Sequence, residues 1–354
     1  MSGTISFAEF KVIISRIMRV LITGGAGFIG SNLCEFFVGK GHTVICLDNL
    51  STGFLHNIEP LMGFQNFTFI KGDIRDIETC KEAVKDCEVV LHEAALGSVP
   101  RSINDPIATN STNISGFLNM LVAARDEGVK RFVYAASSST YGDSKELPKI
   151  EHNIGRPLSP YAITKFVNEL YANVFSSLYG IETIGLRYFN VFGRRQDPNG
   201  AYAAVIPLWV KALIHHTSPF INGDGSYSRD FTYIDNVIQA NELAATVSHD
   251  EIVERASLYN MSLPPEAPID LVFNVAFGGN TTLNDLFKCL RSNLARFDPE
   301  ISSIEPVYRD NRAGDIPHSQ ASIIKAQRIL GYNPKYSAIE GFEQACEWYW
   351  NNLR

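Results

Sequence analysis

Short apolar runs and helical stretches alternate along the first half of this 354-residue chain. β-Branched and aromatic residues gather in the short runs, and apolar residues recur at helical spacing in the stretches between them. Strands that alternate with helices pair in parallel and need cover on both faces of the sheet. The sequence therefore predicts a doubly wound parallel α/β sheet. The expected strands are residues 20–22, 43–47, 67–70, 89–91, 131–134, 183–186 and 271–275.

Two longer helical patterns, at residues 106–127 and 159–179, carry broad apolar faces. In such a fold these faces pack on the sheet, and they can also pair across a dimer axis; burial within one chain is the alternative. After the sixth strand the pattern loosens into segments rich in Gly, Pro and Asn, which is typical of the loops of a second, smaller lobe. Residues 249–268, which contain several prolines, are expected to form a surface insertion.

The composition argues against several classes of partner. The net charge is -7 and Lys and Arg form no run, which disfavours nucleic acid and anionic membrane surfaces. No stretch approaches the roughly 18 apolar residues that a membrane-spanning helix needs. The 6 cysteines show no spacing typical of zinc ligands or of a disulfide framework, so no metal site is predicted. We expect a cytoplasmic protein in which residues 1–17 form an N-terminal helical extension rather than a signal peptide.

A glycine-rich turn follows the first expected strand. Gly24, Gly27 and Gly30 stand where this strand ends and a helix begins. Glycines at such a place keep the turn tight and let the backbone approach a pyrophosphate, which the N–H groups at the helix start then bind. Glycine spacing alone is a weak signal, but the strand before it and the helix after it favour a Rossmann dinucleotide site.

Acidic residues end the next two strands. Asp48 follows the turn by about 20 residues, where such folds recognise a ribose. Its carboxylate would accept hydrogen bonds from the adenosine hydroxyls and repel a 2′-phosphate, so NAD is favoured over NADP. Asp73 is assigned to the adenine amino group, and a turn cap is the alternative for both residues. The predicted cofactor-binding residues are Gly24, Gly27, Phe28, Ile29, Gly30, Asp48, Asn49, Asp73, Ile74, Ala94, Tyr161 and Lys165.

Tyr161 and Lys165 lie four residues apart at the start of the second long helix. Residues at this spacing share one helix face, so the phenol and the ammonium can point into one cleft. We expect the cation to lower the pKa of the phenol toward neutrality, which makes it a usable base. A serine cluster at residues 137–139 ends the fifth strand at the same edge of the sheet. The predicted catalytic residues are Ser137, Tyr161 and Lys165; a surface pair and a turn cap are the alternatives.

Three longer motifs resemble the extended short-chain dehydrogenase/reductase superfamily. They are residues 92–102 (HEAALGSVPRS), 136–143 (ASSSTYGD) and 187–202 (RYFNVFGRRQDPNGAY). The resemblance extends over residues 20–350 and is greatest to nucleotide-sugar 4-epimerases, in particular to the bacterial branch that acts on UDP-N-acetylhexosamines in surface-polysaccharide synthesis. It implies a Rossmann domain at residues 18–190, with returns near 235–248 and 271–276. It also implies a smaller C-terminal α/β lobe, at residues 191–234 and 277–354, that binds the UDP-sugar.

The resemblance further implies a reaction through a transient 4-keto sugar. Tyr161 would take the proton of the C4 hydroxyl, directly or through Ser137, while NAD takes the hydride. Lys165 would hold the nicotinamide ribose. The ketone would then turn over, and the same hydride and proton would return on its opposite face.

The substrate-binding residues are likewise implied by the resemblance. Arg229 and Arg312 are expected at the diphosphate, with a surface ion pair as the alternative, and Phe220 is expected to stack on uracil. Ser319 stands where galactose-specific epimerases carry a tyrosine, so it leaves room for an acetamido group. We therefore expect interconversion of UDP-GlcNAc and UDP-GalNAc. The full set is Gly97, Ser98, Ser138, Ser139, Asn190, Ala204, Val205, Phe220, Asn222, Arg229, Arg312, Asp315 and Ser319.

Other activities remain as alternatives. Relatives that epimerise UDP-N-acetylhexosaminuronic acids bind an extra carboxylate, for which Arg101 or Arg194 is available. A 4,6-dehydratase carries Asp-Glu directly after the relay residue, where this chain has Ser138 and Ser139. A non-catalytic NAD-binding protein is the alternative from another class. A homodimer through the two long helices is also expected.

Overall fold

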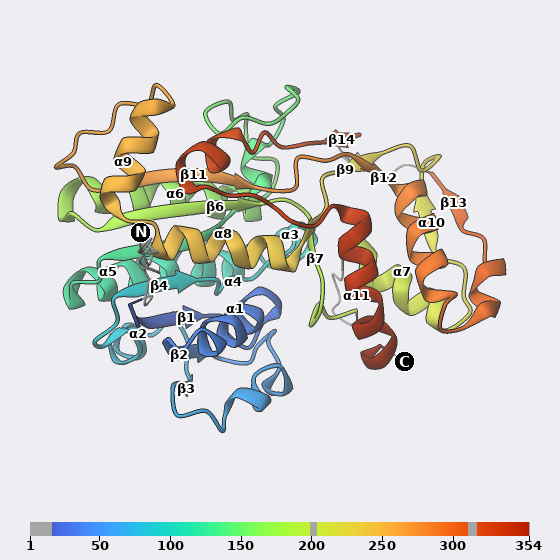
Figure 1. The fold of residues 1–354 in the computed structure, drawn as a ribbon, viewed down its shortest axis with the longest axis horizontal. Helices are drawn as coiled ribbons and strands as arrows, with labels where there is room; N and C mark the ends of the chain where they lie inside the picture. The colour runs from blue at the N-terminus through green and yellow to red at the C-terminus, as the bar shows by residue number, and fades with distance from the viewer. Residues whose placement is uncertain (1–15, 199–203, 311–316, 354) are drawn as a thin grey trace, which may run out of the picture.

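The computed structural model describes residues 16–198, 204–310 and 317–353. At its centre is one sheet of seven parallel strands in the order β11-β6-β5-β4-β1-β2-β3 (Figure 1). The doubly wound prediction is confirmed, and each expected strand lies inside an observed one. The strands are β1 (Arg19–Thr23), β2 (Thr43–Asp48), β3 (Phe67–Lys71), β4 (Val89–His92), β5 (Arg131–Ser137), β6 (Glu182–Tyr188) and β11 (Asp270–Val275).

The order of the strands creates the place for a ligand. The chain builds outward from β1 through β2 to β3, then returns to the other side of β1 and builds β4, β5, β6 and β11. The connections that leave β1 and β4 therefore run in opposite directions. In open parallel sheets a crevice forms at such a switch point, at the carboxyl ends of the strands.

Alternate residues of the strands supply two separate cores. On β1, Val20 and Ile22 point into the core on one face, while Leu21 points into the core on the other. On β5, Val133 and Phe132 divide in the same way. This period of two, with apolar residues at every position, is why the strands read as continuous apolar runs.

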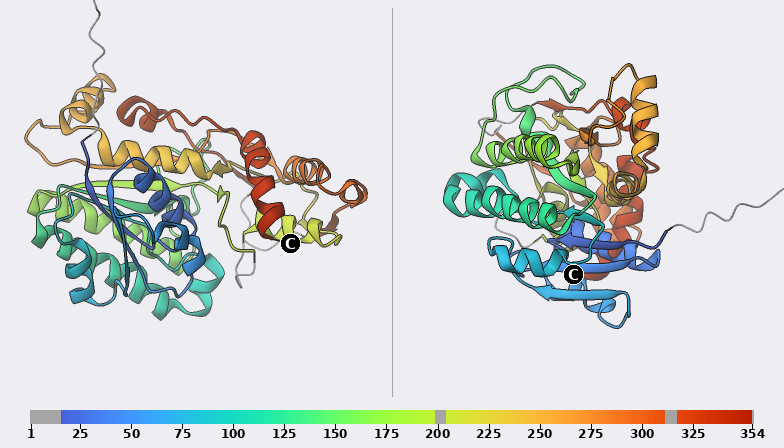
Figure 2. Two further views of the ribbon diagram at one scale, coloured as in Figure 1. Left: turned by 60° about the horizontal axis from the view of Figure 1, so that its bottom comes forward. Right: turned by 90° about the vertical axis from the view of Figure 1, so that its left-hand side faces the viewer.

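Helices cover both faces of the sheet (Figures 1 and 2). α1 (Phe28–Gly39) and α8 (Ile234–Thr246) pack on the face of the first core. α2 (Ile77–Val84), α5 (Phe117–Glu127) and α6 (Pro160–Tyr179) pack on the face of the second. α6 begins where the Ser159 hydroxyl accepts a hydrogen bond from the N–H of Ala162, with Pro160 in the first turn.

The first of the two expected long helices is not a uniform α-helix. α4 (Pro106–Asn110) continues into a π-helical stretch (Ser111–Gly116) and then into α5. A short helix, α3 (Val99–Asn104), precedes it. A π-helical turn inside an α-helix displaces the side chains around it, and such turns are frequent at functional sites.

A second, smaller lobe lies beyond the carboxyl edge of the sheet, and α10, α7 and α11 gather there (Figure 1). Its strands form small separate sheets: β7 (Val191–Phe192) with β10 (Thr232–Tyr233), β8 (Phe220–Asn222) with β13 (Val307–Arg309), and β9 (Ser228–Arg229) between β12 (Thr281–Thr282) and β14 (His318–Ser319). Its helices are α7 (Val205–Ile214), α10 (Leu283–Leu294) and α11 (Ala338–Asn352).

One buried carboxylate ties the segments of this lobe together. Asp230 accepts hydrogen bonds from the backbone N–H groups of Phe277, Gly278, Gly279 and Ala321. Burial raises the pKa of this carboxyl to about 6 in spite of those four donors. The loop that leaves β11 and the segment after β14 are thereby fixed beside Arg229.

Two expectations concern segments outside the sheet. The first half of the expected insertion is a helix, α9 (His249–Leu258), whose start is closed by reciprocal hydrogen bonds between Ser248 and Glu251. The expected N-terminal helix lies outside the described residues, apart from Arg16 and Ile17, which have no helical structure. No helix in residues 16–198, 204–310 and 317–353 is long and apolar enough to span a membrane.

Candidate active site

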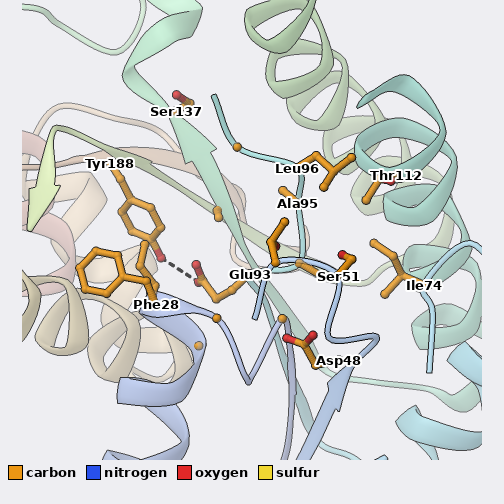
Figure 3. Close-up of a pocket in the computed structure, with 18 of the residues that line it drawn as sticks. Phe28, Asp48, Ser51, Ile74, Glu93, Ala95, Leu96, Thr112, Ser137 and Tyr188 are labelled. Carbon is orange, nitrogen blue, oxygen red and sulfur yellow. Dashed lines mark hydrogen bonds between the residues drawn. The ribbon is translucent and has the colours of Figure 1, made fainter. Parts of the chain in front are cut away.

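A cavity of about 410 Å³ opens at the carboxyl ends of β1, β2, β4, β5 and β6 (Figure 3). It brings together residues that the sequence assigned to the cofactor and to catalysis. The predicted residues that line it are Gly24, Gly27, Phe28, Ile29, Gly30, Asp48, Asn49, Ile74, Ala94, Gly97, Ser137, Tyr161, Lys165 and Asn190.

The glycine turn forms one wall of this cavity. Gly24 has a φ of +67°, and its N–H donates to the Leu47 carbonyl over 2.8 Å. The turn closes where the N–H of Gly27 donates to the carbonyl of Gly24 over 3.0 Å, directly before α1. A Cβ atom on Gly30 would lie 2.2 Å from the Gly24 carbonyl oxygen. The backbone and the helix start therefore stand open to the cavity, which is the geometry that holds a pyrophosphate.

We predict that Gly30→Ala destabilises the fold and releases the cofactor, because the new methyl group would push against the backbone of the turn. The expected loss is about 1–3 kcal/mol in the free energy of unfolding, with a marked loss of bound NAD. Thermal unfolding and the NAD content of the purified protein measure the two effects. Gly39→Ala is the matched control on the same helix, because its Cβ meets no atom within 4 Å. Equal behaviour of the two variants would contradict this account of the turn.

Asp48 is fixed at the edge of the cavity by the backbone. Its two carboxylate oxygens accept hydrogen bonds from the N–H groups of Ala26, over 3.0 Å, and Leu50, over 2.7 Å. Burial raises the pKa of this carboxyl, while those bonds favour its charged form. The bond from Leu50 is the turn cap that the sequence left as an alternative, so Asp48 closes a turn and also lines the cavity.

Asp73, by contrast, is occupied by other side chains. Its carboxylate pairs with the Arg75 guanidinium over 2.7 Å and accepts a hydrogen bond from Asn49 over 2.8 Å. These partners lower the pKa of the carboxyl to about 2. The neighbours Gly72 and Ile74 line the cavity, whereas Asp73 does not. Its observed contacts are those of a turn, as in the alternative interpretation.

The open glycine turn and the Asp48 carboxylate fit a dinucleotide without a 2′-phosphate.

The predicted catalytic residues come from two neighbouring elements. Ser137 ends β5, and Tyr161 and Lys165 stand on the first turns of α6, which packs beside that strand. The Lys165 ammonium lies 6.0 Å from the centre of the Tyr161 ring and donates to the Ala135 carbonyl over 2.7 Å. Tyr161 and Lys165 share one face of α6, and Ser137 lies at the neighbouring edge of the sheet. All three side chains therefore line one cavity, as predicted.

One electrostatic expectation was wrong. The pKa of the Tyr161 phenol is raised, not lowered toward neutrality. Burial is the first cause; a hydrogen bond with Ser137 acts in the opposite direction, and the nearby Glu93 carboxylate adds to the rise. Lys165, which is only 3 % exposed, has its own pKa lowered to about 8 by burial. Burial disfavours the charged form of Lys165, and its ammonium already donates to a backbone carbonyl. It therefore contributes little to stabilising a Tyr161 phenolate.

The serine cluster is organised around Ser137. Its hydroxyl oxygen accepts hydrogen bonds from the N–H of Ser139 over 3.1 Å and from the Ser139 hydroxyl over 2.8 Å. Ser138 and Ser139 begin a short 3₁₀ turn (Ser138–Tyr141), and neither lines the cavity. Ser139 thus holds the Ser137 hydroxyl in place by hydrogen bonds. The sequence did not predict this role for Ser139.

Glu93 is a site residue that the sequence reasoning missed. It follows β4 directly, lines the cavity and accepts a hydrogen bond from the Tyr188 phenol over 2.8 Å (Figure 3). The protein around the cavity removes this carboxyl from bulk water, which raises its pKa to about 7. Its position in the sequence could have indicated it, because Glu93 follows a strand and so lies at the same edge of the sheet as Asp48.

Asn113, in the π-helical stretch, is a second residue that was missed. Its amide oxygen accepts from the N–H of Leu96 over 2.7 Å, and its amide nitrogen donates to the carbonyl of Leu96 over 3.1 Å. The same nitrogen donates to the Thr164 hydroxyl on α6. Asn113 thereby fixes the loop after β4 against α6. No pattern in the sequence marks this π-helical turn.

The predicted substrate residues lie on the smaller lobe and on the loops that face it. Ser98 caps α3, and Asn190, with a φ of +37°, lines the cavity. Ser319 on β14 pairs directly with Arg229 on β9. Ala204 directly precedes α7 and Val205 begins it, while Phe220 and Asn222 bound β8. Arg312 and Asp315 lie outside the described residues, so their predicted contacts are not tested. Within the described ranges, no three His, Cys, Asp or Glu residues come together in a way that would hold a metal ion.

The comparisons with known proteins agree with this geometry. Residues 20–257 match the family model described as "NAD dependent epimerase/dehydratase family". A putative UDP-glucose 4-epimerase of Methanocaldococcus jannaschii is 34% identical over 95% of this chain and 99% of its own. A UDP-N-acetylglucosamine 4-epimerase of Methanobrevibacter ruminantium M1, solved with UDP-N-acetylmuramic acid, is 35% identical with a TM-score of 0.82, covering 94% of this chain and 98% of its own.

A UDP-glucose 4-epimerase of Thermotoga maritima, solved with UDP-glucose, is equally similar. It is 35% identical with a TM-score of 0.83 over 95% of this chain and 100% of its own. Enzymes named for two different sugars thus stand at the same distance, so identity alone does not select the substrate. The match over most of the chain, and the glycine turn and acidic residue that fit the cofactor, show that this protein belongs to the NAD dependent epimerase/dehydratase family and that NAD is its cofactor.

Proposed function

We propose that the protein is a 4-epimerase that interconverts UDP-GlcNAc and UDP-GalNAc through a transient 4-keto sugar. The observation that carries the reaction type is the presence of Ser137, Tyr161 and Lys165 in one cavity with the dinucleotide cradle. The relatives named above support it, since each is named as a 4-epimerase of a UDP-sugar.

Each residue has a defined part in this reaction. The Tyr161 oxygen takes the proton of the C4 hydroxyl and later returns it, with Ser137 as the hydrogen-bond partner that favours the phenolate. Because Ser139 donates to the Ser137 oxygen, the Ser137 proton is free to face Tyr161 or the sugar. Lys165 supplies an ammonium for the nicotinamide ribose. When bound, NAD accepts the hydride from C4 and gives it back.

The sugar specificity rests on the smaller lobe. In this proposal residues 18–190, with the returns near 235–248 and 271–276, hold the cofactor, and residues 191–234 and 277–354 hold the UDP-sugar. Ser319 neighbours Arg229 across β14 and β9, so the strand pair that would bind the diphosphate also presents a small side chain. A small residue leaves volume for an acetamido group. Phe220 keeps an exposed ring for uracil, with the Arg309 guanidinium over one face.

For the uronic acid alternative, one of the two arginines named for the extra carboxylate is already engaged. Arg194 pairs with Asp235 over 2.7 Å and lies 3.9 Å from Glu35. Ser138 and Ser139 offer no acid or base for a dehydratase.

The decisive experiment is to incubate the purified protein with UDP-GlcNAc, without added cofactor, and to follow the anomeric proton signals by NMR. A growing UDP-GalNAc signal is the expected result, and it would also show that NAD stays bound during purification. Turnover of the uronic acid form alone would move the assignment to that substrate. Turnover of UDP-glucose alone would remove the N-acetyl proposal, and no turnover of any UDP-sugar would favour a non-catalytic NAD-binding protein.

We further propose that the protein is a homodimer through the helices at residues 106–127 and α6. Among the described residues, α6 carries an exposed apolar stripe at helical spacing, formed by Ile163, Leu170, Val174 and Leu178, which are 47–68% exposed. Ile107 on α4 is 82% exposed, and α4 packs against α6. A stripe of this kind on a stable helix is typical of a subunit interface.

We predict that the double variant Leu170→Glu/Leu178→Glu is a monomer, because the dimer would have to bury four unpaired carboxylates, two from each subunit. Light scattering of the wild type should give twice the mass of the variant. Ile339→Glu, at an exposed position on α11, should leave the mass unchanged. A monomeric wild type would remove the proposal.

A further inference from the structure

Glu93 is held by a directed chain of hydrogen bonds that ends in the cavity. Asn241 on α8 donates to the Tyr188 phenol oxygen over 2.9 Å, and this phenol donates to a Glu93 carboxylate oxygen over 2.8 Å (Figure 3). Tyr188 is 9% exposed and Asn241 is fully buried. The chain starts in the core and fixes the carboxyl at the cavity wall.

The groups that face Glu93 come from several elements. Tyr188 faces it from β6, and Tyr161 and Lys165 on α6 line the same cavity. α1 contributes the uncharged Phe28 to the cavity, and α8 contributes the uncharged Asn241 behind Tyr188. Among the described residues that line the cavity, Asp48 and Glu93 are the acidic ones and Lys165 is the basic one.

The two acidic residues have different hydrogen-bond partners. Asp48 is held by the N–H groups of Ala26 and Leu50, at the glycine turn. Glu93 is hydrogen-bonded to Tyr188 and lines the same cavity as Tyr161 and Lys165. A buried ammonium needs an opposite charge nearby to remain protonated, and of the two acidic residues that line the cavity Glu93 is the one whose charge acts on Lys165.

We propose that Glu93 is a positioning residue whose carboxylate, held by Tyr188, keeps the buried Lys165 ammonium protonated and restrains Tyr161 from losing its proton. The roles of Tyr161 and Lys165 in this inference rest on the proposed function. Glu93 acts through these two groups by its charge, without contact with the reacting atoms.

The direction of the effect follows from the signs of the charges. A negative charge favours an ammonium and disfavours a phenolate, so ionised Glu93 raises the pKa of Lys165 and of Tyr161. Because the pKa of Glu93 itself is raised to about 7, this charge appears as the pH rises through neutrality. Removing the charge therefore lets Tyr161 ionise at a lower pH and lets Lys165 lose its proton at a lower pH.

The test is an ultraviolet titration of the phenolate in the holoenzyme, without substrate. The protein has 14 tyrosines, so the titration of Tyr161 is taken as the difference between each protein and its Tyr161→Phe counterpart. In Glu93→Gln the midpoint should move to lower pH by about one unit, which is a tenfold rise in the phenolate population at a given pH. The exposed control Glu59→Gln should titrate like the wild type.

Further variants separate charge from structure. Glu93→Asp keeps the charge and should titrate near the wild type. Tyr188→Phe removes the donor that stabilises the carboxylate, so Glu93 should ionise at a higher pH. Glu93 still carries its charge in the pH range where Tyr161 titrates, so the midpoint of Tyr161 in Tyr188→Phe should stay near that of the wild type. If Glu93→Gln does not fold, Glu93→Ala, which also removes the charge, decides the question.

An unchanged midpoint in Glu93→Gln, or one at higher pH, would overturn the proposal. A shift of equal size in Glu93→Asp would do the same, because packing and not charge would then be the cause. For the active enzyme we expect both limbs of the pH profile of Glu93→Gln to move to lower pH. The titration needs no sugar, so a wrong substrate assignment would appear as absent turnover in the wild type and would leave the titration interpretable.

Discussion

Tyr161→Phe should lower kcat by about 1,000-fold while NAD stays bound, because loss of the phenol oxygen removes the group that we propose takes the C4 proton. The ring remains, so the packing of α6 beside β5 and the cradle for the dinucleotide are unchanged. The measurement is the rate of UDP-sugar epimerisation by NMR at saturating substrate, together with the NAD content of the purified variant.

Tyr179→Phe is the control for this substitution. It makes the same change at the other end of α6, where Tyr179 is 49% exposed and packs with Arg125 outside the cavity. This variant should keep the wild-type rate. A Tyr161→Phe enzyme within tenfold of the wild type would show that another group removes the proton.

Ser319→Tyr should abolish most of the turnover of N-acetylated substrates and leave turnover of UDP-glucose. The phenol would fill the volume that the proposal gives to the acetamido group, and we expect a fall of about 100-fold in kcat/KM for UDP-GlcNAc. The ratio of kcat/KM values for the two sugars is the quantity to measure, because a general loss of stability lowers both.

Ser319→Ala is the matched variant that keeps the side chain small. It should retain the preference of the wild type, since the cavity volume is preserved and the register of β14 with Arg229 depends on backbone bonds. If Ser319→Tyr keeps its activity on UDP-GlcNAc, the volume argument is wrong and the sugar pocket lies elsewhere.

The fold was predictable because its signal is local and repeated. Each strand of the large sheet is buried on both faces, so it appears in the sequence as an unbroken apolar run that needs no knowledge of its partners. The helix α9, in the expected surface insertion, also has a local signal, because Ser248 and Glu251 have the spacing of a capping box. The π-helical turn at Ser111–Gly116 has no such local signal.

The membership of the site was predictable, whereas its electrostatics were not. Helical spacing and strand ends placed Ser137, Tyr161 and Lys165 together. The pKa values depend on how much water reaches each group, and that depends on the packing of distant segments. Lys165 is therefore a weaker acidifying partner for Tyr161 than its spacing indicates.

The same limit explains Asp73 and Glu93. The sequence shows both as carboxylates after strands, but it does not show that Arg75 and Asn49 occupy the first. Nor does it show that Tyr188, which is far along the chain, reaches the second. The structure is needed to decide which of several acidic residues at one sheet edge is available to a ligand.

The Asp230 carboxylate has a consequence for how this enzyme can diversify. It fastens the smaller lobe through backbone N–H groups alone, so the side chains of the segments that it holds are not fixed by that bond. The candidate sugar contacts lie on strands of two or three residues, while the candidate proton-transfer residues belong to the large sheet and α6. Inherited substitutions can therefore change the accepted sugar while the redox chemistry is retained, and selection can act on the two properties separately.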